Sequence, residues 1–260
     1  MTDLHAHILP MMDDGPQDLG ESVAMLRLLA KVGFDRIFLT PHFRTGLFDN
    51  TPSRVRAATQ MLRCFLEDAG LAVHLVPSQE VHLDSVLDSH GELRDLLTFG
   101  AGERHLLLEL PRQPFPFDLL LRTVAQLSRA GIRTVLAHPE RHPDFCDSVA
   151  RRRQVLDRGV RFQVNLTSLS GLSGPRAQKA AETLCREGFV SAFGTDAHSY
   201  QDVRAYVPRG LQRAARLMGD GALRAAVMAP EFRFDSGEGV PGGVGVSRAP
   251  AAGGGPRGAE

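Results

Sequence analysis

The 260-residue sequence predicts an α/β fold, in which seven βα units form a parallel barrel related to the (β/α)8 type. Short aliphatic or β-branched runs alternate with longer stretches whose apolar residues recur three or four positions apart, as in Val23, Leu26 and Leu29. Glycines such as Gly33 and Gly131 follow these stretches and precede the next apolar run by one to three residues. This alternation is typical of parallel sheets that are covered by helices.

The apolar runs give the expected strands in chain order. These are Thr2–His5, Arg36–Thr40, Val73–Ser78, His105–Leu110, Thr134–Ala137, Arg161–Val164 and Val190–Phe193. The folded domain is expected to span residues 1–234. Residues 235–260 are rich in Gly, Pro, Ala and Ser with almost no large apolar side chains, so we expect a disordered tail there.

Composition excludes several classes of protein. The 30 basic and 30 acidic residues cancel, so no overall positive field would attract nucleic acid. No apolar run approaches the roughly 20 residues that a membrane span needs, which predicts a protein that is not membrane-embedded. The three cysteines form neither a CxxC motif nor an even set, which favours a reducing compartment. With no recognisable signal peptide, the expected location is cytoplasmic.

Side chains that bind metals follow the carboxyl ends of six of the seven expected strands. They are His5, His7, His42, Glu80, Glu109, His138, Asp196 and His198. Barrels of this type place catalysis at that end of the strands. A lone His-x-His motif is a weak signal, and a lone glutamate after a strand is as often a helix cap or a surface ion pair. The joint pattern is what predicts a metal site.

The chemistry of the set points to more than one divalent cation. His5 and His7 are two positions apart on an extended segment, so both side chains can face one ion. A mixed nitrogen and oxygen set without thiolates suits Mn, Fe or Zn, and a carboxylate such as Glu109 can bridge two cations. Two metals about 3.5–4 Å apart can generate hydroxide and hold the attacking and leaving oxygens of a hydrolysis.

The motifs resemble those of a known family. They are the segment at residues 3–15, which reads Asp-Leu-His-Ala-His-Ile-Leu-Pro-Met-Met-Asp-Asp-Gly, then Thr40-Pro41-His42, Gln79-Glu80-Val81, Leu108-Glu109, Ala137-His138-Pro139-Glu140-Arg141 and Thr195-Asp196-Ala197-His198. Over residues 2 to 228 the chain is similar to the manganese-dependent bacterial protein-tyrosine phosphatases of the PHP superfamily, which are associated with capsule and exopolysaccharide synthesis.

The resemblance implies a distorted (β/α)7 TIM-like barrel, the PHP fold, with up to three Mn²⁺ ions held by the eight residues above. It implies that Arg141 contacts the substrate phosphate. It also implies a second arginine after the last motif, for which Arg204 is the expected counterpart and Arg209 the next choice. The alternative for Arg204 is a solvated helix residue. The implied partners are phosphotyrosine proteins, a bacterial tyrosine kinase among them.

The residues themselves also favour phosphate chemistry. Arg141 lies three positions beyond His138 and can overhang the metals, and the planar guanidinium grips phosphate oxygens in pairs. A tyrosine leaving group needs little protonation because its pKa is about 10. Asp13 or Asp14 could donate a proton or orient water, although an Asp-Asp-Gly turn is also structurally ordinary.

One further motif is rejected. Cys146 and Arg152 have the C-x5-R spacing of cysteine-dependent phosphatases, but the residues between them contain no glycine and place Asp147 beside the thiol. A lowered thiol pKa is therefore not expected.

Three alternative functions remain open at this point. The first is a PHP phosphatase for a small monoester such as histidinol phosphate, the second a phosphodiesterase, and the third a non-catalytic scaffold. The space above the metals separates the first from a protein phosphatase. We expect residues 43–52 and 111–117 to shape that space, with four phenylalanines that either pack a tyrosine ring or pack the barrel edge: Phe43, Phe48, Phe115 and Phe117.

Overall fold

The computed structural model describes residues 1–232 except 89–92, 94–95, 101, 103 and 114. The expected tail at 235–260 and the last two residues of the expected 1–234 domain lie outside the described residues. Within the described part of the chain, no helix is both long and apolar enough to cross a lipid bilayer.

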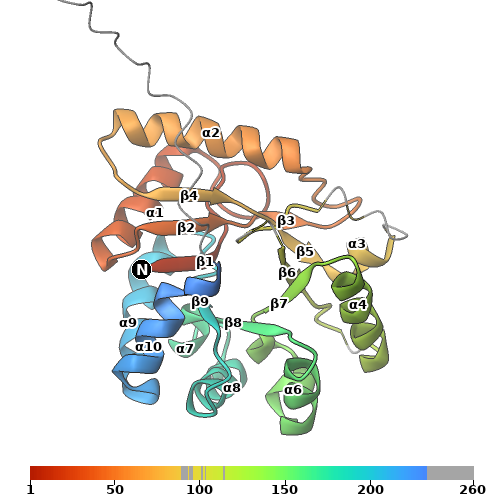
Figure 1. The fold of residues 1–260 in the computed structure, drawn as a ribbon. Helices are drawn as coiled ribbons and strands as arrows, with labels where there is room; N and C mark the ends of the chain where they lie inside the picture. The colour runs from red at the N-terminus through yellow and green to blue at the C-terminus, as the bar shows by residue number, and fades with distance from the viewer. Residues whose placement is uncertain (89–92, 94–95, 101, 103, 114, 233–260) are drawn as a thin grey trace, which may run out of the picture.

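All seven expected strands are present, and two short ones are added. The strands are β1 (Thr2–Ala6), β2 (Arg36–Leu39), β3 (His42–Phe43), β4 (His74–Pro77), β5 (Glu80–His82), β6 (His105–Glu109), β7 (Arg133–Ala137), β8 (Arg161–Asn165) and β9 (Ala192–Gly194). They pair in parallel as β1-β2-β4 and as β3-β5-β6-β7-β8-β9 (Figure 1). The prediction of an α/β fold with a curled parallel sheet is confirmed.

The two added strands arise where a proline interrupts an expected strand or closely precedes a new one. Pro41 has no backbone N–H, so β2 ends at Leu39 and the chain resumes pairing as β3. On the neighbouring strand, β4 has Pro77 as its last residue and β5 begins at Glu80. His42 is then the register partner of Glu80. Two residues that are 38 positions apart in the sequence thereby become direct neighbours.

The last strand lies beside the first. The backbone N–H of Asp196 donates to the carbonyl of His5 at 2.7 Å, and that of His7 donates to the carbonyl of Ala197 at 3.1 Å. The buried carboxylate of Asp3 reinforces this contact, because it accepts hydrogen bonds from the backbone N–H and the hydroxyl of Thr195, both at 2.8 Å. The loop after β9 is therefore fixed against β1 just where both carry candidate ligands.

Helices surround the strands on the outside (Figure 1). They are α1 (Leu19–Val32), α2 (Pro52–Asp68), α3 (Leu83–Asp88), α4 (Phe117–Arg129), α5 (Pro143–Cys146), α6 (Val149–Leu156), α7 (Leu166–Leu169), α8 (Pro175–Arg186), α9 (Tyr200–Met218) and α10 (Asp220–Met228), with the short 3₁₀ turns η2 (Pro139–Arg141) and η3 (Pro230–Phe232). Asp18 caps α1 by accepting from the N–H of Glu21. Gly33 ends the helix at φ 107°, as the sequence predicts.

The sheet has apolar side chains on both of its faces. In β6, Leu106 and Leu108 belong to the main core beneath the helices, whereas Leu107 belongs to a second buried cluster with Val135, Phe99 and other residues. Side chains two apart on a strand share a face, so Leu107 and Glu109 lie on the same side. Glu109 therefore emerges at the edge of a rigid apolar layer, which holds the carboxylate in place.

Candidate metal centre

All eight expected ligands come together, and Asp14 joins them. Their ligand atoms form four overlapping groups in which all atoms lie within 4.8 Å of one another. The groups are His7, Asp14, His42 and His198; His5, Glu80 and His138; His5, His7 and Asp196; and His42, Glu80 and Glu109. Shared members join the groups into one cluster, which is large enough to hold more than one cation.

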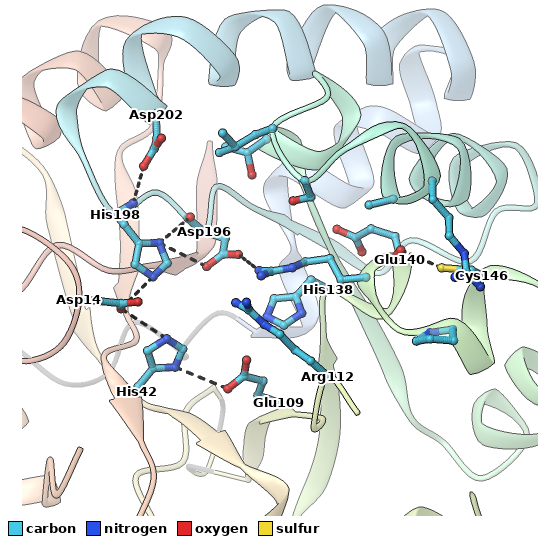
Figure 2. Close-up of a pocket in the computed structure, with 17 residues that line it drawn as sticks. Asp14, His42, Glu109, Arg112, His138, Glu140, Cys146, Asp196, His198 and Asp202 are labelled. Atoms are coloured by element: carbon cyan, nitrogen blue, oxygen red, sulfur yellow. Dashed lines mark hydrogen bonds and ion pairs between the residues drawn. The ribbon is translucent and has the colours of Figure 1, made fainter. Parts of the chain in front are cut away.

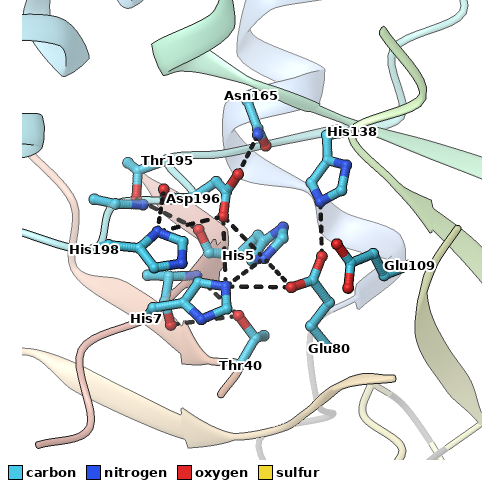
Figure 3. A network of polar contacts seen from close by, with 12 residues as sticks. His5, His7, Thr40, Glu80, Glu109, His138, Asn165, Thr195, Asp196 and His198 are labelled. Atoms are coloured by element: carbon cyan, nitrogen blue, oxygen red, sulfur yellow. Dashed lines mark hydrogen bonds and ion pairs between the residues drawn. The ribbon is translucent and has the colours of Figure 1, made fainter. Parts of the chain in front are cut away.

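Glu80 lies at the centre of this cluster (Figure 3). Its Oε1 is 2.7 Å from Nε2 of His138. Its Oε2 is 2.9 Å from Nδ1 of His42 and 3.3 Å from the Nε2 atoms of both His5 and His7. The side chain is fully buried, and a buried carboxylate needs positive charge beside it.

His5 on β1 and His7 directly after it show that a cation fits here. Nδ1 of His5 is 2.8 Å from the amide oxygen of Gln163, and Nδ1 of His7 is 2.7 Å from the carboxylate of Asp13. Both oxygens only accept, so both Nδ1 atoms carry the proton. The two Nε2 atoms then present lone pairs to each other at 2.9 Å. Such a contact is repulsive unless a proton or a metal ion binds between them.

The pKa shifts show the same need for positive charge. Burial lowers the pKa of His5, but the carboxylates of Glu80 and Asp196 outweigh it and raise the pKa to about 9. Burial likewise lowers the pKa of His198, and the hydrogen bond to Asp14 with the charge of Asp196 raises it to about 9. Protons therefore occupy these histidines when metals do not, and metal binding must displace them.

Asp14 bridges two of the histidines. Its Oδ1 is 3.2 Å from Nε2 of His198 and 3.6 Å from Nε2 of His42 (Figure 2). The hydrogen bond to His198 holds the pKa of this carboxyl well below its usual range. An ionised carboxylate between two imidazoles is suited to ligation, and less suited to the proton-donor role considered from the sequence.

Backbone strain aims two of the candidate ligands. His138 and Asp196 have φ angles of 30° and 50°, in the left-handed region that residues other than glycine seldom adopt. His138 directly follows β7 and Asp196 lies two residues beyond β9, so the tight turn at each redirects the side chain into the cluster. Such strain persists only where the surrounding contacts hold it, and it is concentrated at functional sites.

Strand β8 supplies two amides that sequence reasoning missed. Gln163 donates from Nε2 to Asn165 Oδ1 at 2.7 Å, and Asn165 donates from Nδ2 to Asp196 Oδ2 at 2.7 Å. Because Gln163 also accepts from His5, this amide pair connects ligands on β1 and after β9. Gly194 on β9 packs directly against this pair, because a Cβ added at Gly194 would lie only 2.7 Å from Nε2 of Gln163. Two amides two positions apart, alternating with the buried Phe162 and Val164, were the available signal.

A cavity of about 610 Å³ opens over the cluster (Figure 2). Arg141 lines it and donates from Nη1 to Asp196 Oδ2 at 2.7 Å. The described residues that line the cavity do not include Arg204 or Arg209, both of which are exposed on α9. The structure thus brings Arg141 to the site and leaves the expected second arginine outside it.

The four phenylalanines have different surroundings. Phe48 stacks on the ring of His42, with centroids 5.5 Å apart, so it borders the metal centre. Phe43 packs against the main core. Phe115 packs against His142 and Phe117 against Phe145, with centroids 5.2 Å and 6.1 Å apart, as barrel-edge packing would have them. Pro114 in that segment lies outside the described residues.

Cys146 does not have the surroundings of a nucleophile. Its thiol donates to the backbone carbonyl of Glu140 at 3.0 Å, and burial raises its pKa. Arg152 donates to the backbone carbonyls of Phe145 at 2.6 Å and Cys146 at 3.3 Å and to the carboxylate of Glu187 at 2.9 Å, and none of these bonds involves the thiol. The structure agrees with the rejection of the C-x5-R motif.

The chain is similar to known tyrosine-protein phosphatases along most of its length. The chain is 30% identical over 203 residues to the tyrosine-protein phosphatase YwqE of Bacillus subtilis, covering 76% of this chain and 78% of that protein. It is 24% identical over 226 residues to the tyrosine-protein phosphatase CpsB of Streptococcus pneumoniae, covering 84% and 91%.

The fold is also similar to a solved structure. The solved structure belongs to a set described as YwqE from Bacillus subtilis and CpsB from Streptococcus pneumoniae, unique metal-dependent tyrosine phosphatases. It superposes on this chain with a TM-score of 0.77 and is 26% identical in sequence. The match covers 86% of this chain and 90% of that one. The family model for capsular polysaccharide synthesis, CpsB/CapC, matches residues 1–229. The chain therefore belongs to the CpsB/CapC family.

Proposed function

We propose that this protein is a metal-dependent phosphatase that hydrolyses phosphotyrosine in proteins. One observation carries the proposal: nine histidine and carboxylate side chains from six segments of the chain converge beneath a cavity that Arg141 also lines. The family supports the substrate class, because the relatives are named tyrosine-protein phosphatases.

We propose the following metal ligands: His5, His7, Asp14, His42, Glu80, Glu109, His138, Asp196 and His198. The four overlapping groups suit two or three divalent ions. Mn²⁺ is the proposed metal, and Fe or Zn would also suit a mixed nitrogen and oxygen set. Bound divalent ions would supply Lewis acidity and an activated water.

The chain's own residues then position the substrate. Arg141 has five N–H donors and uses one on Asp196, so the others can bind phosphate oxygens and stabilise charge that develops on them. The ring of Phe48 beside His42 offers an apolar surface at the rim, against which a tyrosine ring can pack. A phenolate is a good leaving group, so this site does not require a strong general acid.

The deciding experiment is a phosphatase assay on protein that is stripped of metal and refilled with Mn²⁺. The substrates are a phosphotyrosine peptide, histidinol phosphate and a dinucleotide. We expect the peptide to be hydrolysed fastest and the stripped protein to be inactive. A clear preference for histidinol phosphate or the dinucleotide would overturn the substrate assignment. Inactivity on all three after refilling would favour the non-catalytic scaffold.

The cellular setting is part of the proposal. Membership of a capsular polysaccharide synthesis family supports a role in capsule or exopolysaccharide production, with a bacterial tyrosine kinase as the phosphorylated partner. Three free cysteines are compatible with the cytoplasm. We also propose that the curled sheet closes as a distorted seven-unit barrel, which the hydrogen bonds between the β9 loop and β1 support.

A further inference from the structure

Arg112 is an arginine at the site that the sequence motifs do not assign. It lies three residues beyond Glu109, on the loop that follows β6, and it lines the cavity over the metal centre. Figure 2 shows its side chain reaching into this cavity beside His138. Its position relative to Glu109 is therefore the same as that of Arg141 relative to His138, on the neighbouring strand.

The partners of the cavity arginines differ. Arg141 donates to Asp196 at 2.7 Å, and Arg176 donates to Asp147 at 2.5 Å. Arg112 also lines the cavity, but it makes no hydrogen bond or ion pair with the described residues. Because no carboxylate among the described residues accepts from Arg112, its guanidinium donors can bind an anionic ligand in the cavity.

A second observation places Arg112 next to Arg141. A separate hollow of about 20 Å³ is lined by both of these residues, together with residues that include Glu109, His138 and His142. The residues that line this hollow come from the ends of β6 and β7 and the loops after them, so both arginines belong to the same part of the cavity wall. Two guanidinium groups that face one cavity from one wall can bind oxygens of the same anion.

We propose that Arg112 and Arg141 together bind the phosphate group of the substrate. Arg112 then takes the role of the second phosphate-binding arginine that the family resemblance assigns to Arg204. A phosphate monoester is a dianion with three free oxygens, and two planar guanidinium groups match both its charge and its geometry. This inference rests on the proposed phosphatase function and names the residue that completes its substrate site.

The test compares three variants in the metal-loaded protein. Arg112→Ala removes the guanidinium, Arg112→Lys keeps a charge without the planar fork, and Arg122→Ala is the matched control on the exposed face of α4. Two quantities are measured: kcat/KM for a phosphotyrosine peptide, and the affinity for inorganic phosphate by calorimetry. Metal content is determined alongside, to show that the cluster is intact.

We expect Arg112→Ala to lower kcat/KM about 10- to 100-fold, the effect of losing one or two charge-assisted hydrogen bonds to the transition state. The affinity of Arg112→Ala for inorganic phosphate should fall as well. Both quantities for Arg112→Lys should lie between those of the wild type and Arg112→Ala, and the metal content of all variants should equal that of the wild type. The inference would be overturned if kcat/KM and phosphate affinity of Arg112→Ala were within about twofold of those of Arg122→Ala. A twofold change is well below the tenfold effect, about 1.4 kcal/mol, that the loss of a phosphate contact should cause.

The two proposals fail separately. If the wild-type protein hydrolyses the peptide and Arg112→Ala does so equally well, the role of Arg112 is refuted while the phosphatase function stands. If the wild-type protein does not hydrolyse the peptide but Arg112→Ala still weakens phosphate binding, the proposed function is refuted while the phosphate-binding role of Arg112 stands.

Discussion

Gln163→Leu tests whether the amide pair on β8 builds the metal centre. In the wild type, Gln163 accepts from Nδ1 of His5 at 2.8 Å and donates to Asn165 at 2.7 Å, and its side chain is fully buried. Leucine has a similar size but can make neither bond. The variant therefore leaves a buried imidazole N–H and a buried amide oxygen without partners.

The expected cost follows from those two bonds. An unsatisfied buried polar group costs about 1–3 kcal/mol, so for two such groups we expect the free energy of unfolding of the metal-free protein to fall by roughly 2–6 kcal/mol. His5 also loses the contact that fixes its tautomer and ring orientation, and loss of such a contact typically weakens metal affinity about 10- to 100-fold.

Urea denaturation of the metal-free protein measures the first effect, and competition with a chelator measures the second. Gln154→Leu is the control, because Gln154 is exposed on α6. If Gln163→Leu matched this control in both measurements, the amide pair would have no role in holding His5, and the argument from its hydrogen bonds would be wrong.

Three further predictions follow from the site and the core. Asp14→Asn should reduce the bound metal without unfolding the protein, because Asp14 lies between His198 and His42; an unchanged metal content by elemental analysis would contradict a ligand role. Cys146→Ser should keep kcat/KM within about twofold, because its thiol has a raised pKa and is not a nucleophile; loss of activity with metals still bound would reverse that conclusion. Burial and the charge of Arg133 lower the pKa of His105 in the folded protein below the ordinary 6.5, so its contribution to stability is complete above 6.5 and is lost as the pH falls below it. The urea midpoint of His105→Phe should therefore depend less on pH between about 7.5 and 5.5 than that of the wild type, and equal slopes would exclude His105 as a cause.

The sequence predicted the strands well because their signal is local. A run such as Leu106, Leu107 and Leu108 must be buried on both faces of a sheet, and the glycine that precedes the next run ends the helix between them. The positions of the candidate ligands could also be predicted from the sequence, because side chains at the carboxyl ends of parallel strands meet at one edge of a barrel. Pro41 separates β2 from β3, and this break also has a local cause, because proline has no backbone N–H. After the break, His42 pairs with Glu80.

The identity of a second phosphate-binding arginine could not be predicted from the sequence in this way. Helix α9 buries Val203 and Val207 against the core, and successive helix positions rotate by about 100°, so Arg204 faces away from the site. Spacing after a motif cannot show this, because the packing of the helix sets its rotation. Arg112 was equally hidden, since a loop arginine has no periodic pattern to mark it.

The sequence by itself thus predicted the parallel α/β fold and eight candidate metal ligands, through residue types at strand ends that lie at one edge of such a sheet. Only the tertiary structure decided how those ligands are held and what lies above them. Gln163 and Asn165 connect His5 to Asp196, and Arg112 lies beside Arg141. The physical reason is that hydrogen bonds and cavity walls depend on distances between separate segments, and the local sequence of no single segment encodes such distances.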